Sequence, residues 1–288
     1  MPAEMEFTGE RFVPQINGNI ELEHMHRYLM ACELAVGKDV LDIACGEGYG
    51  SARMADVAHR VYGVDISPET VTHAKTKYIK NNLSFSVGTC EIIPLPAQSV
   101  DLVVSFETIE HHDKHEEMML EIKRVLRPGG VLIISSPDKQ VYSVEPKYQN
   151  PYHVKELYAD EFIELLTRHF KNTKFFGQKI SYGSVILESE GASPQKSYWD
   201  HNDKVQSING SYKPVYLLCI ASDSELPLVH AGIYDRPESD CGYASYLRAI
   251  IAEQEKQISK LPNFRKSLSL LAKLKNSILK RRNRFMGK

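Results

Sequence analysis

The sequence has no run of about 20 apolar residues, which is the length that a membrane-spanning helix needs. We therefore expect no transmembrane helix. The first ten residues are acidic and polar and do not look like a secretory signal. Both absences favour a cytoplasmic protein. A hydrophobic share of 42% in 288 residues is enough for a substantial core, in one large domain with an appendage or in two small domains.

Cysteine is also scarce. The five cysteines lie at positions 32, 45, 90, 219 and 241, and no two form a Cys-x-x-Cys pair. This pattern gives no zinc signature and fits reduced thiols.

Acidic residues are missing from the last 29 positions, 260–288, which hold ten of the chain's 35 Lys and Arg residues. The other 25 basic residues face 37 acidic ones, so the rest of the chain is acidic. A basic amphipathic helix is typical of a membrane-surface element. We expect residues 262–288 to dock on an anionic membrane surface or on a partner protein. The alternatives are a solvated tail and an RNA contact, and an acidic body without a nucleic-acid module disfavours RNA.

One stretch organises the rest of the chain. Residues 40–50 read VLDIACGEGYG, an apolar run followed by glycines at positions 46, 48 and 50 and then by a segment that can begin a helix. Glycine permits positive φ and lets a ligand approach the backbone closely. The N–H groups at a helix start face such a ligand. The pattern predicts a nucleotide-binding corner, and the alternative is an ordinary tight turn.

Asp42 lies four residues before the first glycine. A carboxylate there disfavours a diphosphate and favours an ammonium group. On these residues the stretch resembles the first motif of the class I S-adenosylmethionine (SAM)-dependent methyltransferases. Arg-Pro-Gly-Gly at 127–130, before an apolar strand, resembles the same family. The resemblance implies an α/β, Rossmann-like doubly wound sheet of seven strands in the order 3-2-1-4-5-7-6, with strand 7 antiparallel.

Asp65 ends the second expected strand, 19 positions after Gly46. This is close to the spacing at which a strand-end carboxylate meets ribose hydroxyls. The alternative is a helix N-cap. Ile66 follows, where it can pack on adenine.

The resemblance implies that further cofactor contacts come from the N-terminal helix and from the ends of the strands. Arg27 and Tyr28, on a helix expected at 21–36, can meet the methionine carboxylate, or they can be surface or packing residues. Thr89 departs from the family, which often has Asp at this position. The full expected set is Arg27, Tyr28, Asp42, Ala44, Gly46, Gly48, Tyr49, Asp65, Ile66, Thr89, Cys90, Glu91, Ser105 and Phe106.

The segment FETIEHHD, residues 106–113, follows the fourth expected strand, where open α/β sheets place their ligands. A histidine there is the natural base for a hydroxyl acceptor, with His111 as the first candidate and His112 as the second. A different interpretation makes Glu107, Glu110 and His111 the ligands of Mg²⁺ or Mn²⁺, similar to a set in ubiquinone-pathway O-methyltransferases. A third gives these residues a structural or cofactor-side role.

Residues 138–156 form a long segment that we interpret as a functional lid. His153 and Tyr152, near its end, are candidates to reach the acceptor, and loop packing is the alternative. The expected organisation is an arm and cofactor-covering helix at 1–37, a methyltransferase domain at 38–222 with a variable insert at 181–212, and a linker and helical tail at 223–288.

Residues 7–14 and 23–28 are similar to methyltransferases of bacterial surface-glycan synthesis. This narrower resemblance implies O-methylation of a sugar, nucleotide-sugar or lipid-linked glycan acceptor at the cytoplasmic membrane face. The alternatives are a quinone- or natural-product-modifying methyltransferase and a cofactor-binding scaffold without chemistry.

Overall fold

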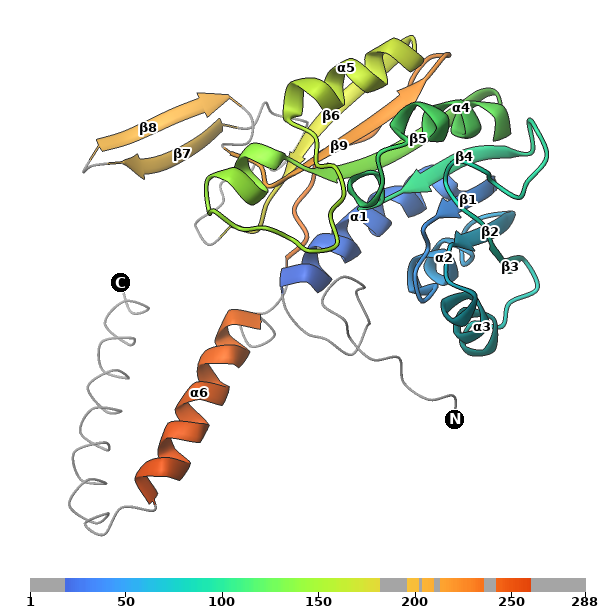
Figure 1. The fold of residues 1–288 in the computed structure, drawn as a ribbon. Coiled ribbons are helices and arrows are strands. Elements are labelled where there is room, and N and C mark those ends of the chain that lie inside the picture. The colour runs from blue at the N-terminus through green and yellow to red at the C-terminus, as the bar shows by residue number, and fades with distance from the viewer. Residues whose placement is uncertain (1–18, 182–195, 202–203, 210–212, 236–241, 260–288) are drawn as a thin grey trace. The chain divides into compact units, whose positions relative to one another are not determined.

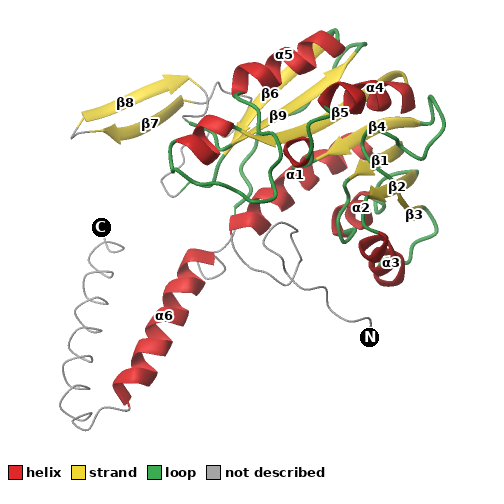
Figure 2. Cartoon of the chain, viewed as in Figure 1, coloured by secondary structure: helices red, strands yellow, loops and turns green. Residues whose placement is uncertain are grey.

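The computed structural model describes residues 19–181, 196–201, 204–209, 213–235 and 242–259. Its main sheet has seven strands in the order β3-β2-β1-β4-β5-β9-β6 (Figures 1 and 2). The strands are β1 (Asp39–Ile43), β2 (Arg60–Asp65), β3 (Leu83–Val87), β4 (Val100–Ser105), β5 (Leu126–Pro137), β6 (Asn172–Gln178) and β9 (Tyr216–Ser222). Strands β1 to β5 pair in parallel, and β9 is antiparallel to both of its neighbours. Since β9 is the seventh strand of this sheet along the chain, the predicted order is confirmed.

One helix precedes the first strand and four follow strands of the sheet, which is the doubly wound pattern. They are α1 (Asn19–Ala35), α2 (Tyr49–Met54), α3 (Pro68–Lys77), α4 (His115–Val125) and α5 (Ala159–His169), with a 3₁₀ turn at Ile109–His111 and a π-helix at Gln140–Val144. The π-helix lies in the segment 138–156, which the sequence analysis interpreted as a lid.

Strand β5 begins at Leu126, earlier than the expected start at Val131, because the Arg-Pro-Gly-Gly segment is itself extended. Val100 of β4 pairs with Leu126, and the register then shifts before Leu102 pairs with Val131. Gly129 has a φ of +80°, a value that glycine adopts without strain. The segment is therefore an irregular start of the strand and not a helix end followed by a turn.

Side chains of β1 alternate between two apolar layers, as the period of two in a strand requires. Leu41 and Ile43 join the core formed by α4 and α5, whereas Val40 joins the core formed by α1 and α2. Figure 1 shows α4 and α5 over one face of the sheet and α1 on the other. Asp42 shares the parity of Val40, so its carboxylate points toward α1 and α2.

The insert predicted at 181–212 contains a two-stranded antiparallel hairpin, β7 (Lys196–His201) and β8 (Lys204–Asn209). Helix α6 (Gly242–Ser259) belongs to a second unit of the chain and is described by itself. Residues 262–288, predicted to form the basic amphipathic helix, lie outside the described residues, as does the arm at 7–14. Among the described helices, none has the length and hydropathy that crossing a bilayer requires. Cys32, Cys45, Cys90 and Cys219 are free thiols.

Helix α5 offers a direct test of the core. Phe162 is fully buried and packs in the α4/α5 layer, while its neighbour Ile163 is 42% exposed. We expect Phe162→Ala to lower the free energy of unfolding by about 3–5 kcal/mol, because it leaves a cavity. Ile163→Ala, the matched control, is expected to cost less than about 1 kcal/mol. Urea unfolding followed by circular dichroism measures both, and equal losses would contradict this packing.

Candidate active site

The glycine turn connects β1 to α2 at the carboxyl edge of the sheet. Gly46 has a φ of +56°, and a Cβ built on it meets nothing within 4 Å, so the backbone is open to a ligand here. Gly48 has a φ of +93°, and a Cβ on it would lie 2.7 Å from the ring of Phe85. A Cβ on Gly50 would lie 2.0 Å from the ring of Tyr28. The turn thus uses one glycine for ligand approach and two for close packing.

Asp42 lies beneath this turn and is 1% exposed. Its Oδ2 accepts a hydrogen bond from Ser51 Oγ at 2.6 Å, and its Oδ1 accepts one from Tyr28 Oη at 3.2 Å. Burial raises the pKa of Asp42 to about 7, although both hydrogen bonds oppose this shift. The side chain is therefore a buried acid poised to ionise near neutral pH. Ser51 was not expected from the sequence, because only the α2 geometry brings it to the carboxylate.

Two aromatic rings, from α2 and from the segment after β4, contact Tyr28. Tyr49, at the start of α2, and Phe106, after β4, both meet the Tyr28 ring edge-on at 5.1 Å between centroids. The hydroxyl of Tyr49 lies 2.8 Å from Nδ1 of His24 on α1. Helix α1 is thereby packed against the glycine turn.

Asp65 joins the ends of β1 and β2. Its Oδ2 accepts a hydrogen bond from the backbone N–H of Gly46 at 3.0 Å, and its Oδ1 accepts one from Ser67 at 2.9 Å. The N-cap of α3 is Ser67, whose Oγ accepts from the N–H of Thr70 at 3.2 Å. The cap function thus belongs to Ser67, while Asp65 braces the glycine turn.

Apolar side chains are exposed beside Asp65, at the ends of β2 and β3. Ile66 is 67% exposed, and Val87 and Ile92 are exposed as well. Thr89 bridges Ile92 across the intervening turn. An apolar surface next to a carboxylate fits the adenine and ribose of a nucleoside.

Glu47, inside the glycine turn, was missed by the sequence analysis. It is 1% exposed and accepts hydrogen bonds from Lys77 Nζ and from Tyr78 Oη, both at 2.7 Å. His73 Nε2 lies 3.3 Å from the same carboxylate. These contacts tie the turn to α3, and the spacing of about 30 residues gives no sequence signal for them.

Arg27 is directed into the interior, where it is 1% exposed. Its Nη1 pairs with Glu107 Oε1 at 2.7 Å and donates to Ser135 Oγ at 3.0 Å, and its guanidinium lies over the Tyr216 ring at 4.7 Å. Glu107 also accepts from Ser135 Oγ at 2.6 Å. Ser135 has the parity of Val131 and Ile133 on β5, so it faces α1. Burial raises the pKa of Glu23, on the same helix, to about 7.

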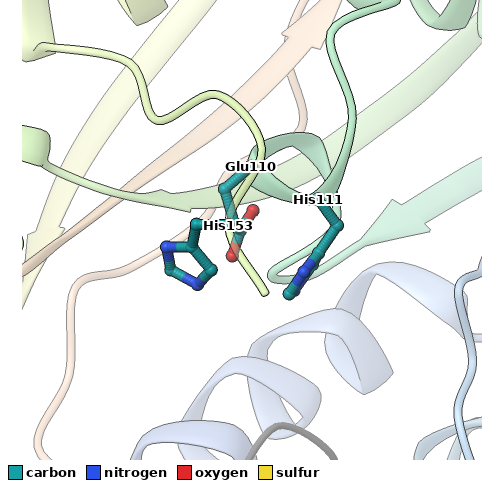
Figure 3. A group of neighbouring side chains, drawn as sticks. All are labelled: Glu110, His111 and His153. Carbon is teal, nitrogen blue, oxygen red and sulfur yellow. The ribbon is translucent and has the colours of Figure 1, made fainter. Parts of the chain in front are cut away.

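The ion pair removes Glu107 from the predicted metal set. Within the described part of the chain, the His, Cys, Asp and Glu side chains whose donor atoms converge closely enough for a metal are Glu110, His111 and His153, which lie within 4.8 Å of one another (Figure 3). In this group His153 thus replaces Glu107, which the sequence analysis had included. The segment that carries His153 lies beside Glu110 because Val154 and Lys155 both donate backbone hydrogen bonds to the Glu110 carbonyl, at 2.8 and 3.0 Å.

The candidate histidines differ in their partners. His111 Nδ1 lies 3.1 Å from the carbonyl oxygen of Tyr152, so Nδ1 carries a proton, and in the neutral ring the lone pair lies on Nε2. His112 Nδ1 accepts from the backbone N–H of Lys114 at 3.1 Å, so the Nε2–H faces Cys90 Sγ at 3.1 Å. Burial lowers the pKa of His112 and raises the pKa of Cys90 to about 12. The lone pair of His112 is therefore engaged by the backbone.

The other predicted contacts are spread along the same edge. Ala44 follows β1 with a φ of +58°, and Ser105 ends β4 with its side chain fully buried. Glu91 accepts a hydrogen bond from Lys114 Nζ at 3.4 Å. These residues lie at the ends of β1, β3 and β4, where the sequence placed the site.

Comparison with known proteins agrees with this geometry. Residues 41–134 match the family described as "Methyltransferase domain". The chain is 38% identical over 169 residues to a protein of Mycolicibacterium smegmatis named as a probable S-adenosylmethionine-dependent methyltransferase, a match that covers 58% of this chain and 65% of that protein. A Mycobacterium tuberculosis protein with a similar name is 35% identical, over 57% of this chain and 61% of its own length. The chain thus spans less than two thirds of these relatives.

Solved structures show the same fold at low sequence identity. The YcgJ protein of Bacillus subtilis superposes with a TM-score of 0.51 at 16% identity, covering 70% of this chain and all of that one. A SAM-dependent methyltransferase of Thermotoga maritima gives a TM-score of 0.50 at 16% identity, over 71% of this chain and 91% of that one. Residues 41–134 thus resemble a methyltransferase domain, in agreement with the class predicted from the sequence, and the solved structures share the Rossmann-like fold of the main sheet.

The buried ion pair makes a testable contribution to stability. Replacing Arg27 with Met leaves the Glu107 carboxylate without its cation, and we expect a loss of about 3–5 kcal/mol in the free energy of unfolding. Arg53→Met, at an exposed position of α2, is expected to change it by less than about 0.5 kcal/mol. Urea denaturation of both variants gives the comparison. A loss below about 1 kcal/mol for Arg27→Met would show that the pair does not hold α1 in place.

Proposed function

We propose that this chain is a SAM-dependent methyltransferase that transfers a methyl group to a hydroxyl of its acceptor. The observation that carries the proposal is the glycine turn at the carboxyl ends of β1 and β2. Its backbone is open at Gly46, and the carboxylates of Asp42 and Asp65 lie next to it. SAM, when bound, supplies an electrophilic methyl group on its sulfonium. The chain's own residues bind and orient the cofactor and acceptor, and they take up the proton that the hydroxyl loses.

The residues at the turn suit each part of that cofactor. Gly46 offers an open backbone surface, and Asp42 lies behind it as a buried acid that favours a nearby cation. Asp65 can accept hydrogen bonds from two ribose hydroxyls. Ile66 presents an exposed apolar side chain beside it, suited to adenine.

The acceptor end lies after β4 and β5. His111 is half-buried, and when its ring is neutral the lone pair lies on Nε2, because Nδ1 donates to the Tyr152 carbonyl. We assign to Nε2 the acceptance of the hydroxyl proton. A base positioned in this way contributes about 10²–10⁴ to the rate of such reactions.

For the acceptor itself, we propose a sugar or glycan precursor, on the resemblance of residues 7–14 and 23–28 to glycan-modifying methyltransferases. A lipid or quinone acceptor is the second candidate. Relatives at 30% and 32% identity are named malonyl-[acyl-carrier protein] O-methyltransferase, from Yersinia pestis, and demethylmenaquinone methyltransferase, from Chlorobaculum parvum. These names describe those proteins, and they are the support for the second candidate.

The deciding experiment measures transfer from labelled SAM to a panel of nucleotide sugars, lipid-linked glycans, acyl carriers and quinones. Methylated glycan would support the proposed acceptor, and methylated lipid or quinone would replace it with the second candidate. Tight SAM binding without transfer to any member would contradict the enzymatic proposal and favour a cofactor-binding scaffold.

His111 and His112 form a matched pair for testing the base. We expect His111→Gln to lower kcat by about 10²–10⁴ with little change in SAM affinity, because only the proton acceptor is lost. His112→Gln is expected to cost less than about tenfold, since the Nδ1 lone pair of His112 already accepts a backbone N–H. Equal losses in the two variants, measured with the acceptor found above, would overturn the assignment.

Asp42 predicts how SAM binding depends on pH. The ionised carboxylate attracts the cationic cofactor, and its pKa of about 7 means that the ionised fraction rises from about one tenth at pH 6 to about nine tenths at pH 8. We therefore expect SAM to bind up to about tenfold more tightly at pH 8 than at pH 6. Asp42→Asn should bind more weakly at pH 8 and lose this dependence. Isothermal titration calorimetry tests both, and an unchanged slope in the variant would exclude Asp42 as the titrating group.

A further inference from the structure

Strand β3 is an outer strand of the main sheet and pairs there with β2 alone (Figure 1). Just before its start, the carbonyl of Asn82 accepts a hydrogen bond from the N–H of Val61 at 2.8 Å. Just after its end, the N–H of Gly88 donates one to the carbonyl of Asp65 at 3.1 Å. Backbone groups of successive residues in a strand point to opposite sides. The even-numbered residues therefore face β2, and the odd-numbered residues of β3 direct their N–H and C=O groups away from it.

The outward backbone groups of β3 form a free edge. Within the described part of the chain, the N–H and C=O groups of Phe85 and Val87 and the carbonyl of Leu83 have no hydrogen-bond partner. A free edge of this kind pairs readily with another strand, and proteins commonly protect it with lysine or proline. Residues 81–88, NNLSFSVG, contain no charged residue and no proline, whereas the other outer strand, β6, carries Lys174.

Side chains at this edge are apolar and partly uncovered on the face that α3 covers. Phe85 packs with residues of α3, so the odd-numbered side chains of β3 lie on that face. Val87, two residues further along, is 47% exposed. A hollow of about 220 Å³ lies at the start of the strand, and its lining includes Leu83, Tyr78 and Ile79.

We propose that β3 pairs with β3 of a second copy of this chain, antiparallel and about a two-fold axis at Phe85. The N–H of Phe85 in each copy then donates to the Phe85 carbonyl of the other copy. The N–H of Val87 in each copy donates to the Leu83 carbonyl of the other. Of the free groups at this edge, only the carbonyl of Val87 is left to water.

The two-fold register also matches the side chains. Residues directly opposite each other in an antiparallel pair lie on the same face of the sheet, so Val87 of the second copy lies beside Leu83. The exposed Val87 side chain thereby covers the hollow at the start of β3. The symmetry repeats this contact, so each copy supplies one apolar side chain and one hollow.

Charge favours the antiparallel arrangement over a parallel one. Lys75 and Lys80 precede β3, and Glu91 follows its end. Antiparallel pairing places the basic end of one strand beside the acidic end of the other, whereas parallel pairing places the lysines of the two copies together. The chain thus carries both complementary halves of the interface, and for this reason we name a second copy as the partner.

A disulfide cross-link tests the register. Ser84 and Ser86 of opposite copies form a non-hydrogen-bonded pair in this arrangement, with Cα atoms about 4.5 Å apart, which a disulfide can span. The full-length double variant Ser84→Cys/Ser86→Cys is oxidised mildly, and covalent dimer is measured on a non-reducing gel. Each single variant places its new thiol about 7–8 Å from its nearest equivalent and should give at least tenfold less dimer.

The natural chain, oxidised in parallel, gives the background from its own cysteines. Covalent dimer in the double variant alone would support the register. A folded double variant that gives no covalent dimer, or single variants that give as much as the double variant, would overturn it.

Sedimentation velocity of the full chain measures the dimer without covalent chemistry. We expect Val87→Pro to raise the dimer Kd at least tenfold, because proline removes the outward N–H and leaves the pairing with β2 intact. Val87→Lys should do the same, since it brings a cation beside Lys75 and Lys80 of the second copy. Leu120→Lys, at a position of α4 that is 61% exposed, is the matched control and should leave the Kd unchanged.

Circular dichroism of every variant separates lost pairing from lost folding. A chain that stays monomeric over the whole concentration range, or a dimer whose Kd neither folded Val87 variant raises, would overturn the interface. The inference does not rest on the proposed function. Neither measurement uses SAM, because Val87 also lies near the surface proposed for adenine, so failure of the interface and failure of the methyltransferase proposal give different results.

Discussion

The burial of one guanidinium is the constraint on which the carboxyl edge of the sheet depends. A fully buried charge costs several kcal/mol unless it is paired, and Arg27 draws its partners from three strands. Glu107 comes from the end of β4, Ser135 from β5, and the Tyr216 ring from β9. Helix α1 can satisfy Arg27 in only one position, and that position brings the next residue, Tyr28, onto Asp42 and against Gly50.

The same ion pair sets the direction of the chain after β4. Glu107 has a φ of +49°, a left-handed conformation that costs a non-glycine residue roughly 1–2 kcal/mol. Hydrogen bonds from Ser135 and Arg27 hold the Glu107 side chain and offset that cost. The chain therefore leaves β4 at a fixed angle, and the turn carrying Glu110 and His111 follows two residues later. The proposed cofactor and acceptor ends of the site thus depend on the same ion pair.

Local pattern was sufficient to predict the sheet and the glycine turn, because strand burial, glycine spacing and helix capping are encoded within about ten residues. The Asp65 position was also readable, since a strand end fixes it. The inward direction of Arg27 was not, because it depends on Ser135 and Tyr216, which are more than 100 residues away. For the same reason the sequence grouped Glu107 with Glu110 and His111, whereas the folded chain brings His153 to them. The spacing of residues along a turn does not show which of their side chains an ion pair will hold away from the others.

Burial has the same electrostatic effect on two carboxyl groups, those of Asp42 and Glu23. Burial raises the pKa of both Asp42 and Glu23 to about 7, so each carboxyl binds its proton more tightly in the folded chain than in the unfolded one. The contribution of each group to the free energy of unfolding therefore falls as pH rises from about 4 to 7. It is smallest above pH 7, where the buried carboxyl is ionised. A cation placed beside Asp42 reverses the sign, because it favours the ionised form. The site is thus under electrostatic strain at neutral pH that a cationic ligand relieves, which links the acid in the first glycine motif to the charge of the cofactor proposed for it.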